Sequence, residues 1–256
     1  MIMVIYIMYQ LYNTFIYIII SLFSFFIFDL LLILFGDNNK KRRWFFTHAI
    51  ANTFITIYTF ENFITCLYEP LLMAEDNIND YLPMNVAISL HLFHLISSYN
   101  NLTIIDWIHH LVSCLFCGFI SQIFINGKMT QYALFFLCGL PGGIDYYLLT
   151  LNKYGLINKI TEKKINVYLN MCIRLPGILF GTFASYICLL YNFNEKMTFI
   201  QNLVLTICNF LNTFNVMYFA IRVVQNYGTY IEYSSRKKVL SQLRRSKSLN
   251  DLNKKK

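Results

Sequence analysis

The stretch YQLYNTFIYIIISLFSFFIFDLLLILF, residues 9–35, decides the fold class of this chain. A spanning helix needs roughly 20 mostly apolar residues to cross about 30 Å of hydrocarbon, and this run exceeds that length. No basic residue precedes it, it is longer than the apolar region of a signal peptide, and no small-residue cleavage site follows it. We therefore predict a first membrane span that is retained.

The composition of the whole chain supports the same class. Hydrophobic residues make up 57% of the 256 residues and charged residues 13%, about half the charged share of a soluble domain. The charges cluster between long uncharged runs, which lie at residues 10–35, 44–68, 84–99, 105–125, 129–150, 166–191 and 198–224. We predict an all-α polytopic membrane bundle of about seven transmembrane helices. Its parts are a first helix and the start of a cytosolic loop (1–39), a membrane domain (40–225) and a basic cytosolic tail (226–256).

The distribution of Lys and Arg predicts how the chain is oriented, because cytoplasmic loops hold the excess of these residues. With seven spans, one side receives only Lys128 and Lys196, whereas the other receives the tail and a larger set: Lys40, Lys41, Arg42, Arg43, Lys153, Lys159, Lys163 and Lys164. The N-terminus is therefore expected outside or in a lumen, and the C-terminus in the cytosol. We expect the tail to be disordered, or to be held on anionic lipid, where each basic residue contributes about 1 kcal/mol.

Ionisable residues within membrane helices are costly and by default mark functional sites or buried pairs. The candidates here are His48, Glu61, His91, His94, His109, His110, Asp145 and Arg174, with Asn170 beside them. At about 1.5 Å of rise per residue, all but Glu61 fall at one depth below the cytosolic surface. This common depth predicts one shared polar site. The alternative is that the histidines lie in interfacial water while Asp145 and Arg174 neutralise each other.

Two proline-glycine groups coincide with this depth. Pro141, Gly142 and Gly143 precede Asp145, and Pro176 and Gly177 follow Arg174. Because proline cannot donate a backbone hydrogen bond, both groups predict helices that are interrupted near the buried charges.

Three stretches resemble one known family. These are IIDWIHHLVSCLFCGFIS (104–121), PGGIDYYLLTLNKYG (141–155) and NVYLNMCIRLPG (166–177). The His pair, the multi-span layout and the later aspartate together resemble the TLC family of membrane proteins, which includes the ceramide synthases. The resemblance covers roughly residues 40–225. It implies a protein of lipid metabolism or homeostasis in the endoplasmic reticulum.

In the ceramide-synthase branch, paired histidines carry acyl transfer from acyl-coenzyme A to the amine of a sphingoid base. The resemblance assigns this role to His109 and His110, with Asp145 as a third catalytic residue and Lys153 loosely matching a lysine that follows. We expect substrate contacts from His91, His94, Asn170 and Arg174. Gly142 and Gly143 stand where that branch has a second His-Asp pair, so the pattern is closer to the general TLC type. We expect acyl-coenzyme A as a co-substrate, and neither a bound cofactor nor a metal.

The residues alone allow the same chemistry. Imidazole is suited to moving protons near neutral pH and can also serve as a nucleophile. Asp106 is a good N-cap for the helix that carries His109 and His110, and Asp145 or His94 could orient the pair. Membrane lipids are the expected partners, nucleic acid is not, and homo-oligomer formation stays open.

Several alternatives stay open beside acyl transfer. The first is a non-catalytic protein for lipid binding, trafficking or membrane composition. A di-iron hydroxylase would need more than the five histidines present, although His91, His94 and the pair could hold a single metal ion. Seven spans also fit a receptor, but no signalling triplet follows the third run. Cys114 and Cys117 form a CxxC inside a predicted helix, where packing is the expected role.

Overall fold

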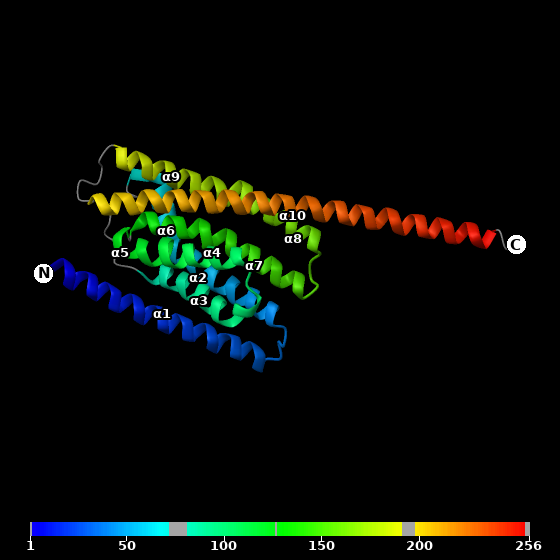
Figure 1. Cartoon of the computed structure of the whole chain (residues 1–256), viewed down its shortest axis with the longest axis horizontal. Helices are drawn as coiled ribbons and strands as arrows, with labels where there is room; N and C mark the ends of the chain where they lie inside the picture. The colour runs from blue at the N-terminus through cyan, green and yellow to red at the C-terminus, as the bar shows by residue number, and fades with distance from the viewer. Residues whose placement is uncertain (1, 72–80, 126, 191–197, 254–256) are drawn as a thin grey trace.

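The computed structural model describes residues 2–71, 81–125, 127–190 and 198–253. It is all-helical, with 93% helix and no strand in this part of the chain. The described residues form seven continuous helical rods (Figure 1). They are α1 (Ile2–Leu34); α2 (Lys40–Tyr68); α3 (Leu82–Ser98), which ends in η2 (Tyr99–Asn101); α4 (Ile104–Leu111), η3 (Val112–Ile120) and α5 (Ser121–Ile125); α6 (Lys128–Leu134), η4 (Phe135–Gly139) and α7 (Leu140–Lys153); α8 (Lys159–Tyr168), η5 (Leu169–Arg174) and α9 (Leu175–Leu190); and α10 (Phe199–Asn253).

Within the described residues, five helical segments are long and apolar enough to cross a membrane: Leu11–Leu34, Ile104–Ile125, Lys128–Lys153, Lys159–Leu190 and Phe199–Leu243. The chain is therefore an integral, multi-pass membrane protein. The rod α3 is apolar but only 17 residues long. The rod α2 is less apolar because it opens on the basic run at residues 40–43 and buries polar side chains such as Asn52 and Thr59.

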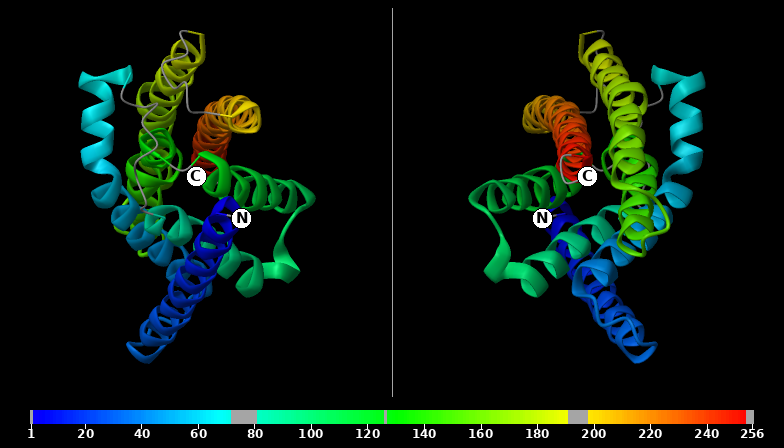
Figure 2. Two further views of the ribbon diagram at one scale, coloured as in Figure 1. Left: turned by 90° about the vertical axis from the view of Figure 1, so that its left-hand side faces the viewer. Right: turned by 90° about the vertical axis from the view of Figure 1, so that its right-hand side faces the viewer.

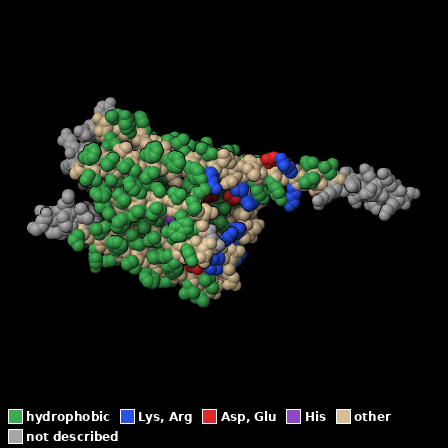
Figure 3. Space-filling model, in the orientation of Figure 1, with side chains coloured by type: hydrophobic (Ala, Val, Ile, Leu, Met, Phe, Trp, Pro, Cys, Tyr) green, Lys and Arg blue, Asp and Glu red, His purple; other side chains and the backbone are tan. Residues whose placement is uncertain are grey.

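The surface reverses the pattern of a soluble protein. Large apolar side chains point outward along the rods, as at Phe23, Ile57 and Phe183, which are 64%, 73% and 62% exposed. Polar side chains such as Asn85 and Gln131 are buried instead. Figure 3 shows a broad hydrophobic face over the bundle, with Lys and Arg gathered at one end. This arrangement fits a bundle whose solvent is lipid, because lipid offers polar groups no partners.

The basic end is held together by contacts between neighbouring loops. Arg42 forms an ion pair with Asp37 at 2.6 Å, and the Tyr154 hydroxyl donates to the same carboxylate at 3.1 Å. The hydrogen bond from Arg42 holds the pKa of Asp37 below its ordinary value of 3.8. Because Tyr154 follows α7, these contacts join the corner between α1 and α2 to the loop before α8.

The rod α1 lies at the edge of the bundle (Figure 2), where it packs on α2 and α3. An apolar cluster forms this contact, with Ile18 of α1 beside Ile55 of α2 and Leu90 of α3. A second cluster packs α6 and η4 against α9 through Tyr132, Phe135 and Ile178, among others.

The predicted helix interruptions at Pro141 and Pro176 are wrong, because both rods continue as helix through these prolines. Instead, π-helical turns stand just before the prolines: η4 precedes Pro141 and η5 precedes Pro176. A π turn widens the helix and so accommodates a residue without an N–H group. A third π stretch, η3, lies in the rod that carries the His pair.

The predicted disordered tail is also wrong for the described residues, because α10 continues as one helix to Asn253 and projects beyond the bundle (Figure 1). Between residues 226 and 253 the sequence has no proline and one glycine, Gly228. Arg236 and Glu232 also form an i,i+4 ion pair at 2.5 Å, which favours helix.

Candidate functional site

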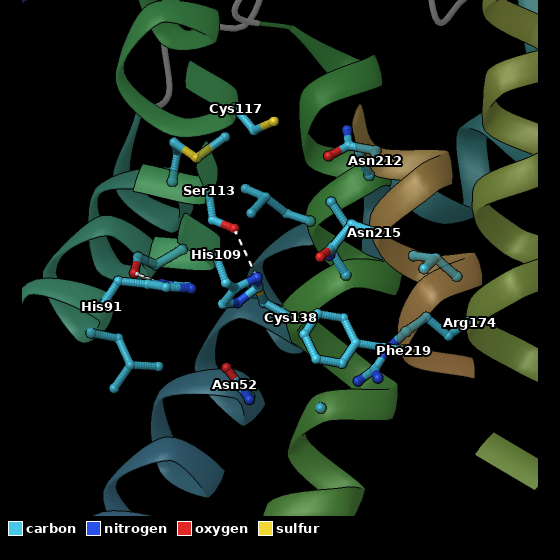
Figure 4. Close-up of a pocket in the computed structure, with 18 of the residues that line it drawn as sticks. Asn52, His91, His109, Ser113, Cys117, Cys138, Arg174, Asn212, Asn215 and Phe219 are labelled. Carbon is cyan, nitrogen blue, oxygen red and sulfur yellow. Dashed lines mark hydrogen bonds between the residues drawn. The ribbon is translucent and has the colours of Figure 1, made fainter. Parts of the chain in front are cut away.

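A cavity of about 420 Å³ lies between the rods and is lined by residues of every rod except α1. All five histidines line it, together with Asp145, Asn170 and Arg174. The structure thus brings every predicted site residue to one cavity, part of which Figure 4 shows. Glu61 is exposed and lies elsewhere on α2, as its predicted depth implies.

The histidine rings form a connected cluster that three helices supply. His110 is central, because its ring centroid lies 4.7 Å from His94, 5.2 Å from His91 and 5.5 Å from His109. His91 also lies 5.8 Å from His109. His48 of α2 extends the cluster to α7, since its ring is 5.9 Å from His94 and 4.6 Å from Tyr146.

Backbone carbonyls fix the tautomers of two rings in this cluster. Nδ1 of His48 lies 2.9 Å from the Trp44 carbonyl oxygen, and Nδ1 of His91 lies 2.8 Å from that of Ala87. A carbonyl oxygen can only accept, so Nδ1 donates and Nε2 carries the free lone pair in the neutral ring. Nδ1 of His110 is buried and has no hydrogen-bond partner among the described residues. The cluster therefore holds several imidazole nitrogens that can accept or pass on a proton.

The carboxylate nearest the His pair in sequence is placed differently from the prediction. Thr103, not Asp106, is the N-cap of α4, and Asp106 is the third helical residue of a capping box. The Asp106 carboxylate accepts from the Thr103 backbone at 2.9 Å and from its hydroxyl at 2.8 Å. Thr103 is extended (φ −80°, ψ 163°), which suits an N-cap. Asp106 lines the cavity and interacts electrostatically with His109 and His110.

Asp145 lies in the same cavity but within a different group of side chains. It interacts electrostatically with Arg174 and accepts a hydrogen bond from Asn166, while its Oδ1 is buried and has no partner in the part of the chain that the structure describes. Arg174 donates from Nη1 to Asn170 at 2.7 Å and from Nε to the Phe136 carbonyl at 3.3 Å. The ring next to His110 belongs to His94, so His94 is better placed than Asp145 to orient the pair. The attraction between Asp145 and Arg174 also agrees with the alternative in which these two side chains neutralise each other.

The prediction missed three amides of α10 that line the cavity: Asn209, Asn212 and Asn215. Figure 4 shows Asn212 and Asn215 across the cavity from His109 and Ser113. Asn215 is a hydrogen-bond partner of His109, and the Ser113 hydroxyl lies 3.5 Å from His109 Nδ1. The signal was present in the sequence, because spacing by three residues places these amides on one helix face.

The described side chains form neither a metal-binding group nor a disulfide. Within the described residues, no group of three or more His, Cys, Asp or Glu side chains is arranged to hold a metal ion. All seven cysteines are free thiols, and Cys117 hydrogen-bonds to Cys208 of α10.

No protein-family model matches this chain, and comparisons with curated proteins and with solved structures found no match. The resemblance to the TLC family therefore stays an expectation from the three stretches quoted above.

Proposed function

We propose that this chain is a TLC-type membrane protein that transfers an acyl group from acyl-coenzyme A to the amine of a sphingoid-type lipid. One observation carries the proposal: five imidazoles from three helices meet in a single cavity, with carboxylates of Asp106 and Asp145 on its wall. Imidazoles gathered in a cavity inside a bundle suit proton transfer between reacting groups near neutral pH.

The proposed reaction needs one base and one acid. The amine nitrogen attacks the thioester carbonyl, the new C–N bond forms and the C–S bond breaks. His110 takes the proton that the amine loses, because its ring lines the cavity at the centre of the histidine cluster. His109 and His91, whose rings adjoin His110, pass that proton to the departing thiolate. His94 holds the ring of His110 in place from the opposite helix.

The proposed setting is the endoplasmic reticulum, with seven spans, a lumenal N-terminus and a cytosolic C-terminus. The excess of Lys and Arg at one end of the bundle supports this orientation. His48 lies about one turn beyond the basic run that opens α2, so the histidines lie near that end. Coenzyme A would then reach the site from the cytosol. The basic part of α10 would contact anionic lipid there.

A second function is favoured by a specific observation at Gly142. A side chain there would place its Cβ 2.8 Å from Asn52 Nδ2. The second His-Asp pair of the ceramide-synthase branch therefore has no room here without a shift of Asn52. This favours the alternative in which the cavity binds lipid for trafficking or membrane composition without turnover.

Purified protein supplied with acyl-coenzyme A and a long-chain amine separates the two functions. Acyl transfer predicts product from the wild type and a loss of about 100-fold or more in His110→Ala, since a positioned base contributes at least that much. Glu61→Ala is the control, because Glu61 lies outside the cavity. Lipid that co-purifies with the wild type, without product, would instead favour the binding role.

A further inference from the structure

The last part of α10 extends beyond the other rods as a single helix (Figure 1). Lys159, at the start of α8, holds its ammonium group 5.1 Å from the centroid of the Tyr230 ring, so Tyr230 lies level with the start of α8. At about 1.5 Å per residue, Val239 lies about 13 Å and Leu243 about 20 Å farther along the helix. This segment therefore projects into water at the basic end of the bundle.

Three large apolar side chains lie on one face of the projecting segment. Val239, Leu240 and Leu243, which we call the apolar triad, are 53%, 56% and 59% exposed. Residues three and four apart are neighbours on a helix surface, so Leu243 adjoins both of the others. Figure 3 shows hydrophobic and basic side chains next to each other on this part of α10. A contiguous apolar surface in water indicates an interaction site.

The opposite face of the same segment is basic. At about 100° per residue, Lys237, Lys238 and Arg245 lie on the side of the helix away from the apolar triad, and all three are exposed. Residues 233–250 contain six Lys or Arg and no Asp or Glu. The segment is therefore a basic amphipathic helix, a type that binds either a membrane surface or an acidic groove of another protein.

The direction of the helix distinguishes between these two partners. A helix that binds a membrane surface lies in the plane of the membrane, with its apolar face in the headgroup region. Here α10 instead continues along the axis of its own membrane-spanning part (Figure 1). Lipid headgroups can neutralise the basic residues nearest the bundle without covering the apolar triad. The geometry therefore favours a protein partner.

We propose that residues 233–250 form a docking helix for a cytosolic protein whose apolar groove has an acidic rim, as in calmodulin. The groove buries the apolar triad, and its carboxylates pair with Lys237, Lys238 and Arg245. Such binding uses apolar anchors spaced by three and four residues, which the triad provides. The inference takes from the proposed function only the cytosolic position of the C-terminus, because none of these residues lines the histidine cavity.

Calcium-loaded calmodulin is the probe, and the full-length protein is held in nanodiscs of phosphatidylcholine. We expect saturable binding by biolayer interferometry that weakens as salt rises, because the partners carry opposite charges. The double variant Val239→Gln, Leu243→Gln should lose about 100-fold or more in affinity, since two buried anchors are removed. Glutamine is a good helix former and carries no charge, so the fold and any acyl transfer should be unchanged.

Ser241→Gln is the matched control, because Ser241 is exposed on the same helix but lies opposite the apolar triad. It should bind calmodulin as the wild type does. Absence of binding by the wild type, or binding that the double substitution leaves intact, overturns the proposal.

The membrane alternative is tested with Leu240→Trp in nanodiscs of anionic lipid. A protein-docking helix predicts that brominated lipid quenches the fluorescence of this variant no more than that of the wild type, which has two tryptophans. Additional quenching would place the apolar triad in the bilayer and would also overturn the proposal.

Discussion

At the residue scale, Asp29 shows how a single carboxylate fixes a membrane helix. It lies in the apolar α1, where it accepts from Arg43 Nε of α2 at 2.8 Å, and Arg43 is only 8% exposed. Removing one partner of such a pair leaves a poorly solvated charge. We predict that Asp29→Leu lowers the free energy of unfolding by about 1–3 kcal/mol, less than for a fully buried pair because Asp29 is partly exposed.

Thermal unfolding in detergent measures this effect. Glu61→Leu is the control, because it makes the same substitution at an exposed carboxylate that has no ion pair among the described residues. The double variant Asp29→Leu, Arg43→Met should recover part of the loss, since no unpaired charge remains. An Asp29→Leu midpoint equal to that of Glu61→Leu would contradict this role.

At the scale of elements, glycines set the contact between α9 and the rod that holds η4. A Cβ at Gly177 would lie 2.3 Å from the Phe136 ring, and one at Gly181 would lie 2.8 Å from Tyr132. We predict that Gly177→Ala destabilises the protein by about 1–3 kcal/mol, as overpacking does. The shift would also move Arg174, which bonds to the Phe136 carbonyl. Lipid binding should therefore fall together with the thermal midpoint.

Gly228→Ala is the matched control for this contact, because nothing lies within 4 Å of a Cβ there. In an exposed helix this change should stabilise slightly, by about 0.5–1 kcal/mol. The variant Gly177→Ala, Phe136→Leu should regain stability if the clash with the ring is the cause. If Gly177→Ala and Gly228→Ala melt alike, the two helices do not pack as described.

Elements were predictable wherever their signal is local. The predicted spans 105–125 and 129–150 agree closely with the observed helical segments Ile104–Ile125 and Lys128–Lys153. The agreement arises because the length of an apolar run is visible directly in the sequence. The rod predicted from residue 166 begins at Lys159 instead. Its first turns carry Lys and Glu, and polar residues hide a helix from a search for apolar runs.

The site was predictable in depth but not in detail. The rise per residue placed the histidines at one level, since depth needs no knowledge of helix rotation. Which carboxylate meets which partner depends on rotation and packing, so Asp145 was assigned to the His pair although Arg174 and Asn166 are its partners. Residue type does not single out Asn209 and Asn212, because asparagine is common throughout this sequence, and only their spacing by three residues with Asn215 indicates a shared helix face.

At the scale of the whole molecule, the number of crossings decides on which side each loop lies. With seven spans, α2 and α3 both cross, so Tyr68 at the end of α2 and Leu156 after α7 lie on opposite sides of the membrane. With only the five strongly apolar segments crossing, both loops lie on the same side. Figure 1 shows α2 running from the end that holds loop 35–39 to the opposite end of the bundle, which favours seven.

Labelling of sealed microsomes with a membrane-impermeant maleimide distinguishes the two counts. Tyr68→Cys and Leu156→Cys suit the purpose, since the native side chains are 82% and 71% exposed, and the wild type with its seven cysteines gives the background. We predict that Leu156→Cys is labelled at once, because basic loops face the cytosol. Tyr68→Cys should be labelled only after the membrane is permeabilised. Immediate labelling of both would reduce the count to five, and would leave His48, His91 and His94 on helices that do not cross the bilayer.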